Sequence, residues 1–211
     1  MSFKDIYKQK WFVPAVAVIV VAIAAVIIFT MPKGQKSTES KVMTPKTTGQ
    51  KLTAKEAWTA VSAEFTKWAA DVSLTEVFST TRAGETGLEG KPVGWDFKAY
   101  SKSLGEELSY FVGLDGELVQ GSKDKKAESE LGSPIFTIAD WVIDSSAAFT
   151  TADVNGGSDL KGTANYDAVY DLKLDKTSGN LIWTLYYPSP SKAKFTALID
   201  AKSGELLRTS E

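Results

Sequence analysis

The chain contains no cysteine and no histidine among its 211 residues. Without cysteine it has no disulfide, no thiol nucleophile and no Cys-ligated zinc or iron–sulfur site. Without histidine it lacks the commonest general base at neutral pH and the commonest metal ligand in proteins. These absences exclude a Ser-His-Asp triad and a His-based metal centre, and they leave an enzyme only carboxylates, a Ser–Lys dyad or rarer arrangements.

An excess of charge of either sign is also missing. The formal net charge is −2 and the sequence pI is about 5.4, so no basic footprint for nucleic acid is present. Ser-x-x-Lys pairs such as Ser122/Lys125 and Ser189/Lys192 fall in expected loops, whereas a dyad needs a lysine that is desolvated. We therefore predict a protein that is not an enzyme and that carries no cofactor.

One long hydrophobic run is present near the N-terminus. Residues 12–31 read FVPAVAVIVVAIAAVIIFTM and contain no charged group. As a helix they span about 30 Å, the thickness of a bilayer hydrocarbon core. A cleaved signal peptide would have a shorter apolar region followed by a small-x-small site, which is absent at Thr30-Met31-Pro32. We expect an uncleaved transmembrane helix over 12–31, with the lipid bilayer as one partner.

The residues on either side of this run set the expected layout. Lysines near the two ends are equal in number, so the positive-inside count gives no orientation: Lys4, Lys8 and Lys10 precede the run, and Lys33, Lys36 and Lys41 follow it. A short tail before a long polar domain favours a cytoplasmic tail over 1–11 and a single-pass protein whose C-terminal domain lies outside the cytoplasm. Residues 32–52, rich in Lys, Ser, Thr and Gly, predict a flexible linker.

The folded part is expected to begin with a helix at residue 53. Thr53 and Glu56 have capping-box spacing. One apolar stripe at helical spacing follows, formed by Trp58, Val61, Phe65 and Trp68. Alternating patterns then predict strands over 74–80, 94–101, 108–114 and 117–120, with a hairpin turn at Asp115-Gly116.

The second half predicts the same plan. Thr137 and Asp140 give a second possible cap, and a shorter amphipathic helix is expected from Ile138, Trp141, Val142 and Phe149. Strands are expected over 168–174, 181–187, 194–200 and 205–208, with Gly-containing turns between the members of each hairpin. Each half thus reads as a helix, a Trp-bearing strand, another strand, a Gly-Glu-Leu turn and a final strand, which indicates an internal duplication.

The C-terminal stretch LIWTLYYPSPSKAKFTALIDAKSGELLR, residues 181–208, resembles a PepSY-type module, and residues 53–120 resemble a more divergent copy. The layout is similar to that of membrane-anchored regulators of bacterial cell-wall elongation with PepSY-like repeats. The resemblance implies an α+β fold in which each of two small units, 53–122 and 135–211, packs an antiparallel sheet on a helix (PepSY/cystatin-like). It also implies peptidase inhibition or control of wall-synthesis machinery.

Two groups of residues are candidates for binding. The aromatic candidates are Tyr170, Trp183, Tyr186 and Tyr187; along a strand, one member of the Tyr186-Tyr187 pair should face the core and the other should face water. The metal candidates are Asp153, Asn155 and Asp159, which resemble the opening of a calcium loop. The EF-hand pattern needs Gly and Glu at the positions occupied here by Ser158 and Ala164, so a surface turn is the alternative reading.

The function expected from these features is a membrane-anchored extracytoplasmic interaction or regulatory protein that binds an envelope protein or peptide. Sheet edges and exposed aromatic side chains would supply the binding surface. One alternative is a ligand- or calcium-sensing binding module that uses residues 153–159. A second alternative is an envelope hydrolase that uses carboxylates.

Overall fold

The computed structural model describes residues 48–80, 86–161, 168–187 and 195–210, all of which belong to the compact unit 43–211. The expected cytoplasmic tail, the expected membrane span 12–31 and the linker up to residue 47 lie outside the described residues. Among the residues that are described, no helix has the length and apolar character needed to cross a bilayer.

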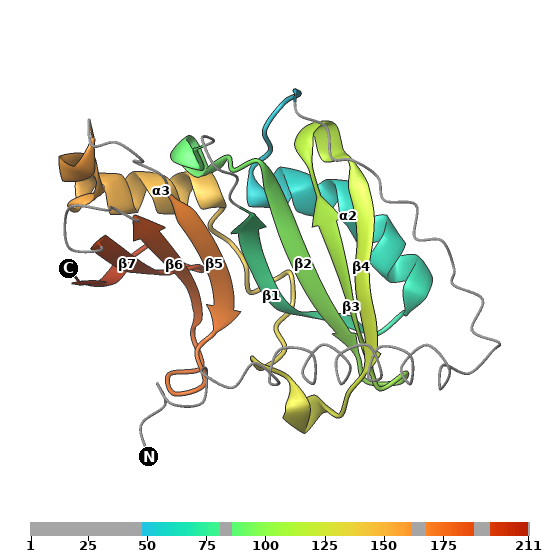
Figure 1. Ribbon diagram of the computed structural model, residues 1–211. Helices are drawn as coiled ribbons and strands as arrows, with labels where there is room; N and C mark the ends of the chain where they lie inside the picture. The colour runs from blue at the N-terminus through green and yellow to red at the C-terminus, as the bar shows by residue number, and fades with distance from the viewer. Residues whose placement is uncertain (1–47, 81–85, 162–167, 188–194, 211) are drawn as a thin grey trace, which may run out of the picture. The chain divides into compact units, whose positions relative to one another are not determined.

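The described elements form an α+β fold, as expected, with one helix followed by four strands in each half of the chain (Figure 1). The first half comprises α2 (Ala54–Trp68), β1 (Val72–Thr80), β2 (Gly94–Ser101), β3 (Glu106–Val112) and β4 (Leu118–Lys125). The second half comprises α3 (Ser145–Val154), β5 (Val169–Leu174), β6 (Leu181–Tyr187), β7 (Phe195–Asp200) and β8 (Leu206–Ser210).

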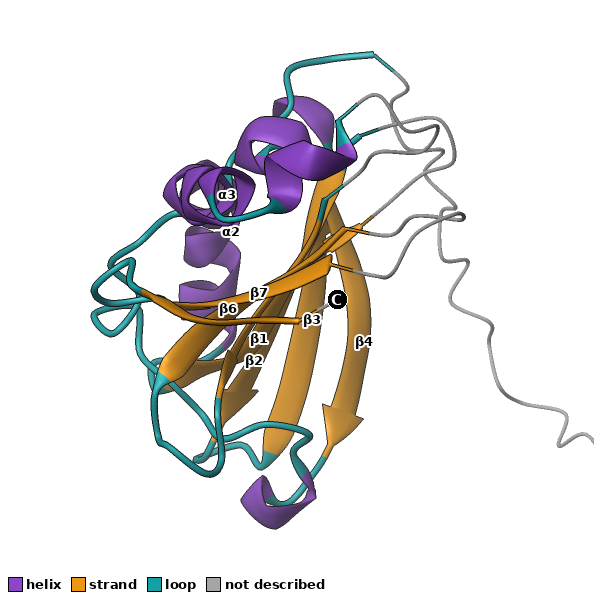
Figure 2. Ribbon diagram, turned by 90° about the vertical axis from the view of Figure 1, so that its left-hand side faces the viewer, coloured by secondary structure: helices purple, strands orange, loops and turns teal. Residues whose placement is uncertain are grey.

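All eight strands lie in one antiparallel sheet of order β4-β3-β2-β1-β5-β6-β7-β8. Figure 2 shows α2 and α3 on the same side of this sheet, where the alternate inward side chains of the strands are buried. The opposite face carries Glu76, Lys98, Asp171, Lys173 and Tyr186, and it is called the open face below. A sheet covered by helices on one side accounts for the alternation of apolar and polar residues along most strands.

The two halves meet where β1 pairs with β5. Only two residue pairs join these strands in register, Val77 with Leu172 and Phe78 with Asp171. Nearer the start of β1, Leu74 exchanges backbone hydrogen bonds of 3.0 and 2.8 Å with Phe136, which belongs to the segment connecting β4 to α3. That connecting segment therefore continues the pairing of β1 where β5 no longer lies beside it.

Aromatic rings hold the same junction from the helix side. Trp183 of β6 lies 6.1 Å from Trp95 of β2, 6.4 Å from Tyr170 of β5 and 5.9 Å from Trp141, measured between ring centroids. All four side chains are buried. The core is thus continuous across the two halves and does not divide at residue 122 or 135.

The start of α2 follows the sequence prediction. The Thr53 hydroxyl accepts a hydrogen bond from the Glu56 N–H at 3.3 Å, and the Glu56 carboxylate accepts one from the Thr53 N–H at 2.8 Å. This reciprocal pair satisfies two N–H groups that the first helical turn would leave unbonded. The predicted apolar stripe faces the sheet, with Val61 and Phe65 fully buried.

The prediction of a helix that includes Ile138, Trp141 and Val142 is wrong. Residues 137–140 form a turn in which Asp140 accepts hydrogen bonds from the N–H and the hydroxyl of Thr137. Helix α3 begins at Ser145, capped by Asp144, and Ile138 and Val142 are 45% and 50% exposed. Trp141 is buried because its ring packs against Trp183. This burial comes from a tertiary contact and does not indicate that the residue lies in an amphipathic helix.

Candidate functional site

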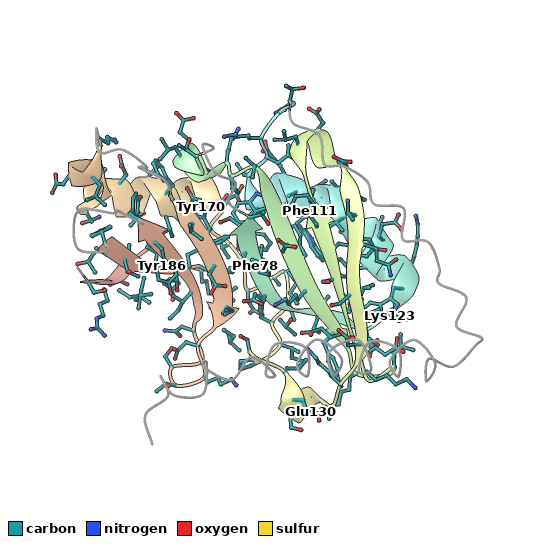
Figure 3. The ribbon with its side chains drawn as sticks, viewed as in Figure 1. Phe78, Phe111, Lys123, Glu130, Tyr170 and Tyr186 are labelled. Carbon is teal, nitrogen blue, oxygen red and sulfur yellow. The ribbon has the colours of Figure 1, made fainter. Side chains whose placement is uncertain are left out.

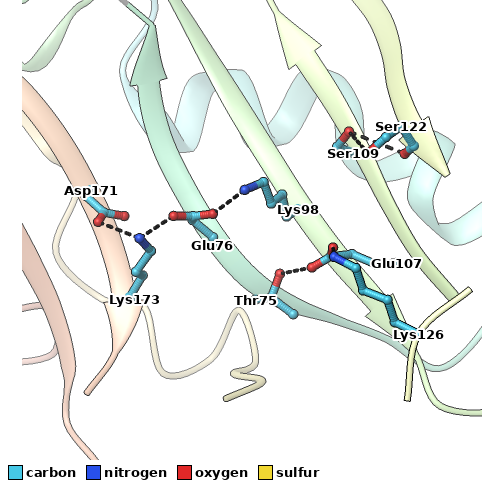
Figure 4. Close-up of polar contacts among 9 residues, drawn as sticks. All are labelled: Thr75, Glu76, Lys98, Glu107, Ser109, Ser122, Lys126, Asp171 and Lys173. Atoms are coloured by element: carbon cyan, nitrogen blue, oxygen red, sulfur yellow. Dashed lines mark hydrogen bonds and ion pairs between the residues drawn. The ribbon is translucent and has the colours of Figure 1, made fainter. Parts of the chain in front are cut away.

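A chain of charged side chains crosses the open face at the junction of the two halves (Figure 4). Glu76 of β1 lies between two lysines: one carboxylate oxygen accepts a hydrogen bond from Lys98 of β2 at 2.6 Å, and the other pairs with Lys173 of β5. The ammonium of Lys173 also pairs with Asp171 at 2.9 Å. Only two residue pairs join β1 and β5 in register, so the Glu76–Lys173 contact adds a side-chain link where the two strands have few backbone pairs.

The environment of these groups shifts their pKa values in opposite directions. Burial alone would raise the pKa of Glu76, but the ammonium groups of Lys173 and Lys98 outweigh it and hold that pKa below its usual range. Burial raises the pKa of Asp171, and Lys173 offsets this only in part. One oxygen of Asp171, Oδ1, is buried without a hydrogen-bond partner among the described residues. The open face therefore holds Glu76 firmly as an anion and disfavours the charge on Asp171.

A second ion pair lies beside the first. Glu107 of β3 pairs with Lys126 and also accepts a hydrogen bond from the Thr75 hydroxyl at 3.2 Å. Glu107 is only 8% exposed, so its carboxylate is largely shielded from water. The hydrogen bond to Glu107 raises the pKa of Lys126, which stays charged at neutral pH.

Aromatic side chains accompany these charges. Phe78 lies on the open face between Asp96 and Asp171, its partners on the neighbouring strands, and the Lys98 ammonium stands 4.9 Å from the centre of its ring. Figure 3 shows Phe78 of β1 and Tyr186 of β6 on this face. Burial raises the pKa of Asp96, although the Thr80 hydroxyl donates a hydrogen bond to its carboxylate.

Two hollows open beside the charged chain. The larger one, about 340 Å³, has Leu174, Ile182 and Leu198 on its walls, together with Asp171 and other polar residues. The smaller one measures about 190 Å³, and the residues that line it are Thr75, Glu76, Lys98, Glu107, Lys126, Gly132, Ser133 and Lys173. Gly132, Ser133 and Lys173 border both hollows, which are therefore adjacent.

The four aromatic candidates from the sequence are not equivalent in the structure. Tyr170, Trp183 and Tyr187 are at most 1% exposed and belong to the core, whereas Tyr186 is 44% exposed. The expectation that one member of the Tyr186-Tyr187 pair faces water is confirmed. The prediction of a binding role for the other three is wrong. Their side chains point from the strands toward the helices, where a partner on the protein surface cannot reach them. Tyr186 alone remains accessible.

The metal candidates lie at the end of α3 and just after it. Asp153 pairs with Lys161 at 2.6 Å, and the Asn155 amide donates to the carbonyl oxygen of Thr151 at 2.7 Å. Asp159 is exposed on the short 3-10 helix Gly157–Leu160. Across the described part of the chain, no cluster of three or more acidic side chains is arranged to hold a metal ion. Calcium binding at 153–159 stays a prediction.

The residues that form the open-face site were not singled out by sequence reasoning. Glu76, Lys98 and Lys173 occupy ordinary polar positions of alternating strands. Glu76 and Lys98 lie opposite each other across β1 and β2, and the pairing of β1 with β5 brings Lys173 to them. The arrangement fixes charges of both signs around two hollows, which suits recognition of a polar ligand. No family model matches the chain, and no curated protein or solved structure matches it either.

Proposed function

We propose that the chain is a membrane-anchored interaction protein that performs no catalysis of its own and binds an envelope protein or peptide outside the cytoplasm. In this proposal residues 12–31 cross the bilayer, residues 1–11 form a cytoplasmic tail and residues 32–52 connect the anchor to the folded domain. The uncharged length of residues 12–31 supports the anchor.

We also infer that the folded domain arose as two PepSY-like units, 53–122 and 135–211. The order of one helix and four strands occurs twice, and the second strand of each set carries a buried tryptophan, Trp95 or Trp183. The turn before the fourth strand contains a glycine of positive φ in each set, Gly116 at 76° and Gly204 at 80°. These correspondences support a duplication.

The strand register supports the same inference. Ser79 lies opposite the tryptophan of β2, and Leu172 lies opposite the tryptophan of β6, so these two positions correspond. The residues one step earlier, Phe78 and Asp171, lie opposite each other across β1 and β5. If a two-fold axis relates the two halves, equivalent residues must face each other where the axis crosses the sheet. The pairing of Phe78 with Asp171 meets this condition.

One observation carries the proposed function: among the described elements, the helices α2 and α3 cover one face of the sheet. The open face presents fixed charges, two hollows and the exposed ring of Tyr186. Charged and aromatic groups held in place by a rigid sheet lose little conformational freedom on binding. Tyrosine is also among the residues enriched at protein interfaces. The open face is therefore the surface that we assign to the partner.

Cross-linking in membranes, followed by purification of the full-length chain, tests this function. Thr184 lies on the open face beside Asp171 and Leu198, and Thr59 is exposed on α2. The substitution Thr184→Arg should remove a specific cross-linked protein, and Thr59→Arg, the same change on the helix side, should retain it. Equal recovery of that protein with both variants would contradict the assignment.

The anchor has its own test. A chain that lacks residues 1–31 should move from the membrane fraction to the soluble fraction, and protease added outside intact cells should digest the domain of the full-length chain. Retention of the shortened chain in membranes after alkaline extraction would exclude residues 12–31 as the anchor. Protection from protease would reverse the proposed orientation.

A further inference from the structure

We propose that the two adjacent hollows of the open face bind the C-terminal end of a peptide. The smaller hollow receives the terminal carboxylate, and the larger one receives the last side chain. This inference rests on the proposed function and makes it more specific, because it names the chemical group by which the partner is recognised.

Hydrogen-bond donors surround the smaller hollow. The ammonium groups of Lys98, Lys126 and Lys173 all border it. Each ammonium has three N–H donors. Lys98 gives a hydrogen bond to Glu76, Lys126 to Glu107, and Lys173 pairs with Glu76 and Asp171, so each ammonium keeps donor capacity for an incoming anion.

Gly132 and Ser133 border both hollows. Neither backbone N–H, nor the Ser133 hydroxyl, makes a hydrogen bond within the described part of the chain, although Ser133 is only 9% exposed. No atom lies within 4 Å of the position that a Cβ on Gly132 would occupy. Consecutive N–H groups beside open space are a common way to hold a carboxylate.

The charges around the smaller hollow favour a carboxylate over a phosphate. Three lysines and two glutamates line the smaller hollow, and Asp171, which pairs with Lys173, borders the neighbouring one. Glu76 and Lys126 both stay charged at neutral pH, given the directions of their pKa shifts. A carboxylate, with a single negative charge, is repelled less by these acidic side chains than a phosphate dianion would be.

The larger hollow fits the residue that carries the carboxylate. Its apolar side chains are Leu174, Ile182 and Leu198, and it shares Lys173 with the smaller hollow. A terminal residue bound through its carboxylate would thus place its own side chain against these aliphatic groups. Burial of an aliphatic side chain there would add affinity, because apolar surface is removed from water. We therefore expect preference for a large aliphatic residue at the peptide C-terminus.

The test uses the full-length chain in detergent and a set of acetylated tetrapeptides, Ac-Ala-Ala-Ala-X, with X = Leu, Ala or Asp. Each peptide is measured by calorimetry as the free acid and as the C-terminal amide. The Leu acid should bind at least about tenfold more tightly than its amide and than the Asp acid. Its affinity should fall as salt rises, since charge attraction contributes to it. Equal affinities for acid and amide would overturn the proposal, as would tighter binding of inorganic phosphate than of the Leu acid.

A matched pair of lysine variants locates the effect. Lys126 and Lys123 each pair with a neighbouring glutamate of β3, but only Lys126 borders a hollow. Lys126→Gln should weaken binding of the Leu acid at least about fivefold, and Lys123→Gln should leave it within about twofold. Equal effects of the two variants would refute the subsite. If the peptides fail to bind but the Thr184→Arg cross-linking difference persists, the subsite is wrong and the proposed function stands.

Discussion

Replacement of Trp183 tests whether this residue has a structural role or a binding role. The sequence predicted that it binds a partner. The indole is fully buried, its ring contacts three other aromatic rings, and its N–H donates to the carbonyl oxygen of Ile143 at 2.8 Å. Truncation of a buried tryptophan to alanine costs about 3–5 kcal/mol, because the apolar surface is lost and a cavity remains. The Ile143 carbonyl adds little to this cost, since Trp141 also donates to it at 2.8 Å.

We therefore expect Trp183→Ala to lower the free energy of unfolding by about 3–5 kcal/mol, which corresponds to a fall in Tm of roughly 6–20 °C for a domain of this size. Urea and thermal unfolding followed by circular dichroism measure this change. Tyr186→Ala, at the exposed position three residues further along β6, should change stability by less than about 0.5 kcal/mol and should weaken partner binding. A Trp183→Ala protein of unchanged stability that has lost its partner would refute the assignment of Trp183 to the core.

Three further predictions follow from local geometry and charge. Gly90→Ala should destabilise the fold by at least about 2 kcal/mol, since φ is +75° and the new Cβ would lie 2.3 Å from the backbone nitrogen of Ser146; chemical denaturation measures the change. Hydrogen bonds from a side-chain hydroxyl and a backbone N–H lower the pKa of Asp71 to about 2, and NMR titration should give that pKa. The contribution of Asp71 to folding stability is therefore present above about pH 4 and is lost as the pH falls toward 2. Glu76→Gln should reduce stability at pH 7 by about 1–2 kcal/mol and should make stability fall less steeply in acid. The reason is that the ionised Glu76 carboxylate, whose pKa is lowered in the fold, stabilises the protein until it is protonated. An unchanged dependence of stability on acid pH would contradict this.

Local signals in the sequence predicted most of the strands and the first helix. The capping box at Thr53 and Glu56 depends on residues three positions apart, and the hairpins depend on turns of a few residues, so both are visible in a single sequence. Strands β2 and β6 have the predicted bounds, 94–101 and 181–187. Short-range physical chemistry is enough for these elements.

Contacts between distant residues account for what was missed. The apolar residues Ile138 and Val142 suggested a helix, yet the segment follows an irregular path because Trp141 packs on a ring of β6 and the N–H of Val142 donates to the Ala201 carbonyl at 3.0 Å. The single sheet depends on pairing between residues 77–78 and 171–172, for which no local pattern exists. The contact of Lys173 with Glu76 on the open face depends on the same pairing and could not be predicted either.

Site-specific photo-cross-linking most directly tests the central proposal, that the open face of this protein binds a partner at the membrane. A photoreactive residue is placed either at Tyr186, 44% exposed on the open face, or at Val154, 72% exposed at the end of α3, and membranes are irradiated with the full-length chain in place. The account predicts a discrete protein adduct at position 186, lost in the Thr184→Arg background, and no such adduct at position 154. The same adduct at position 154 with none at 186 would contradict it.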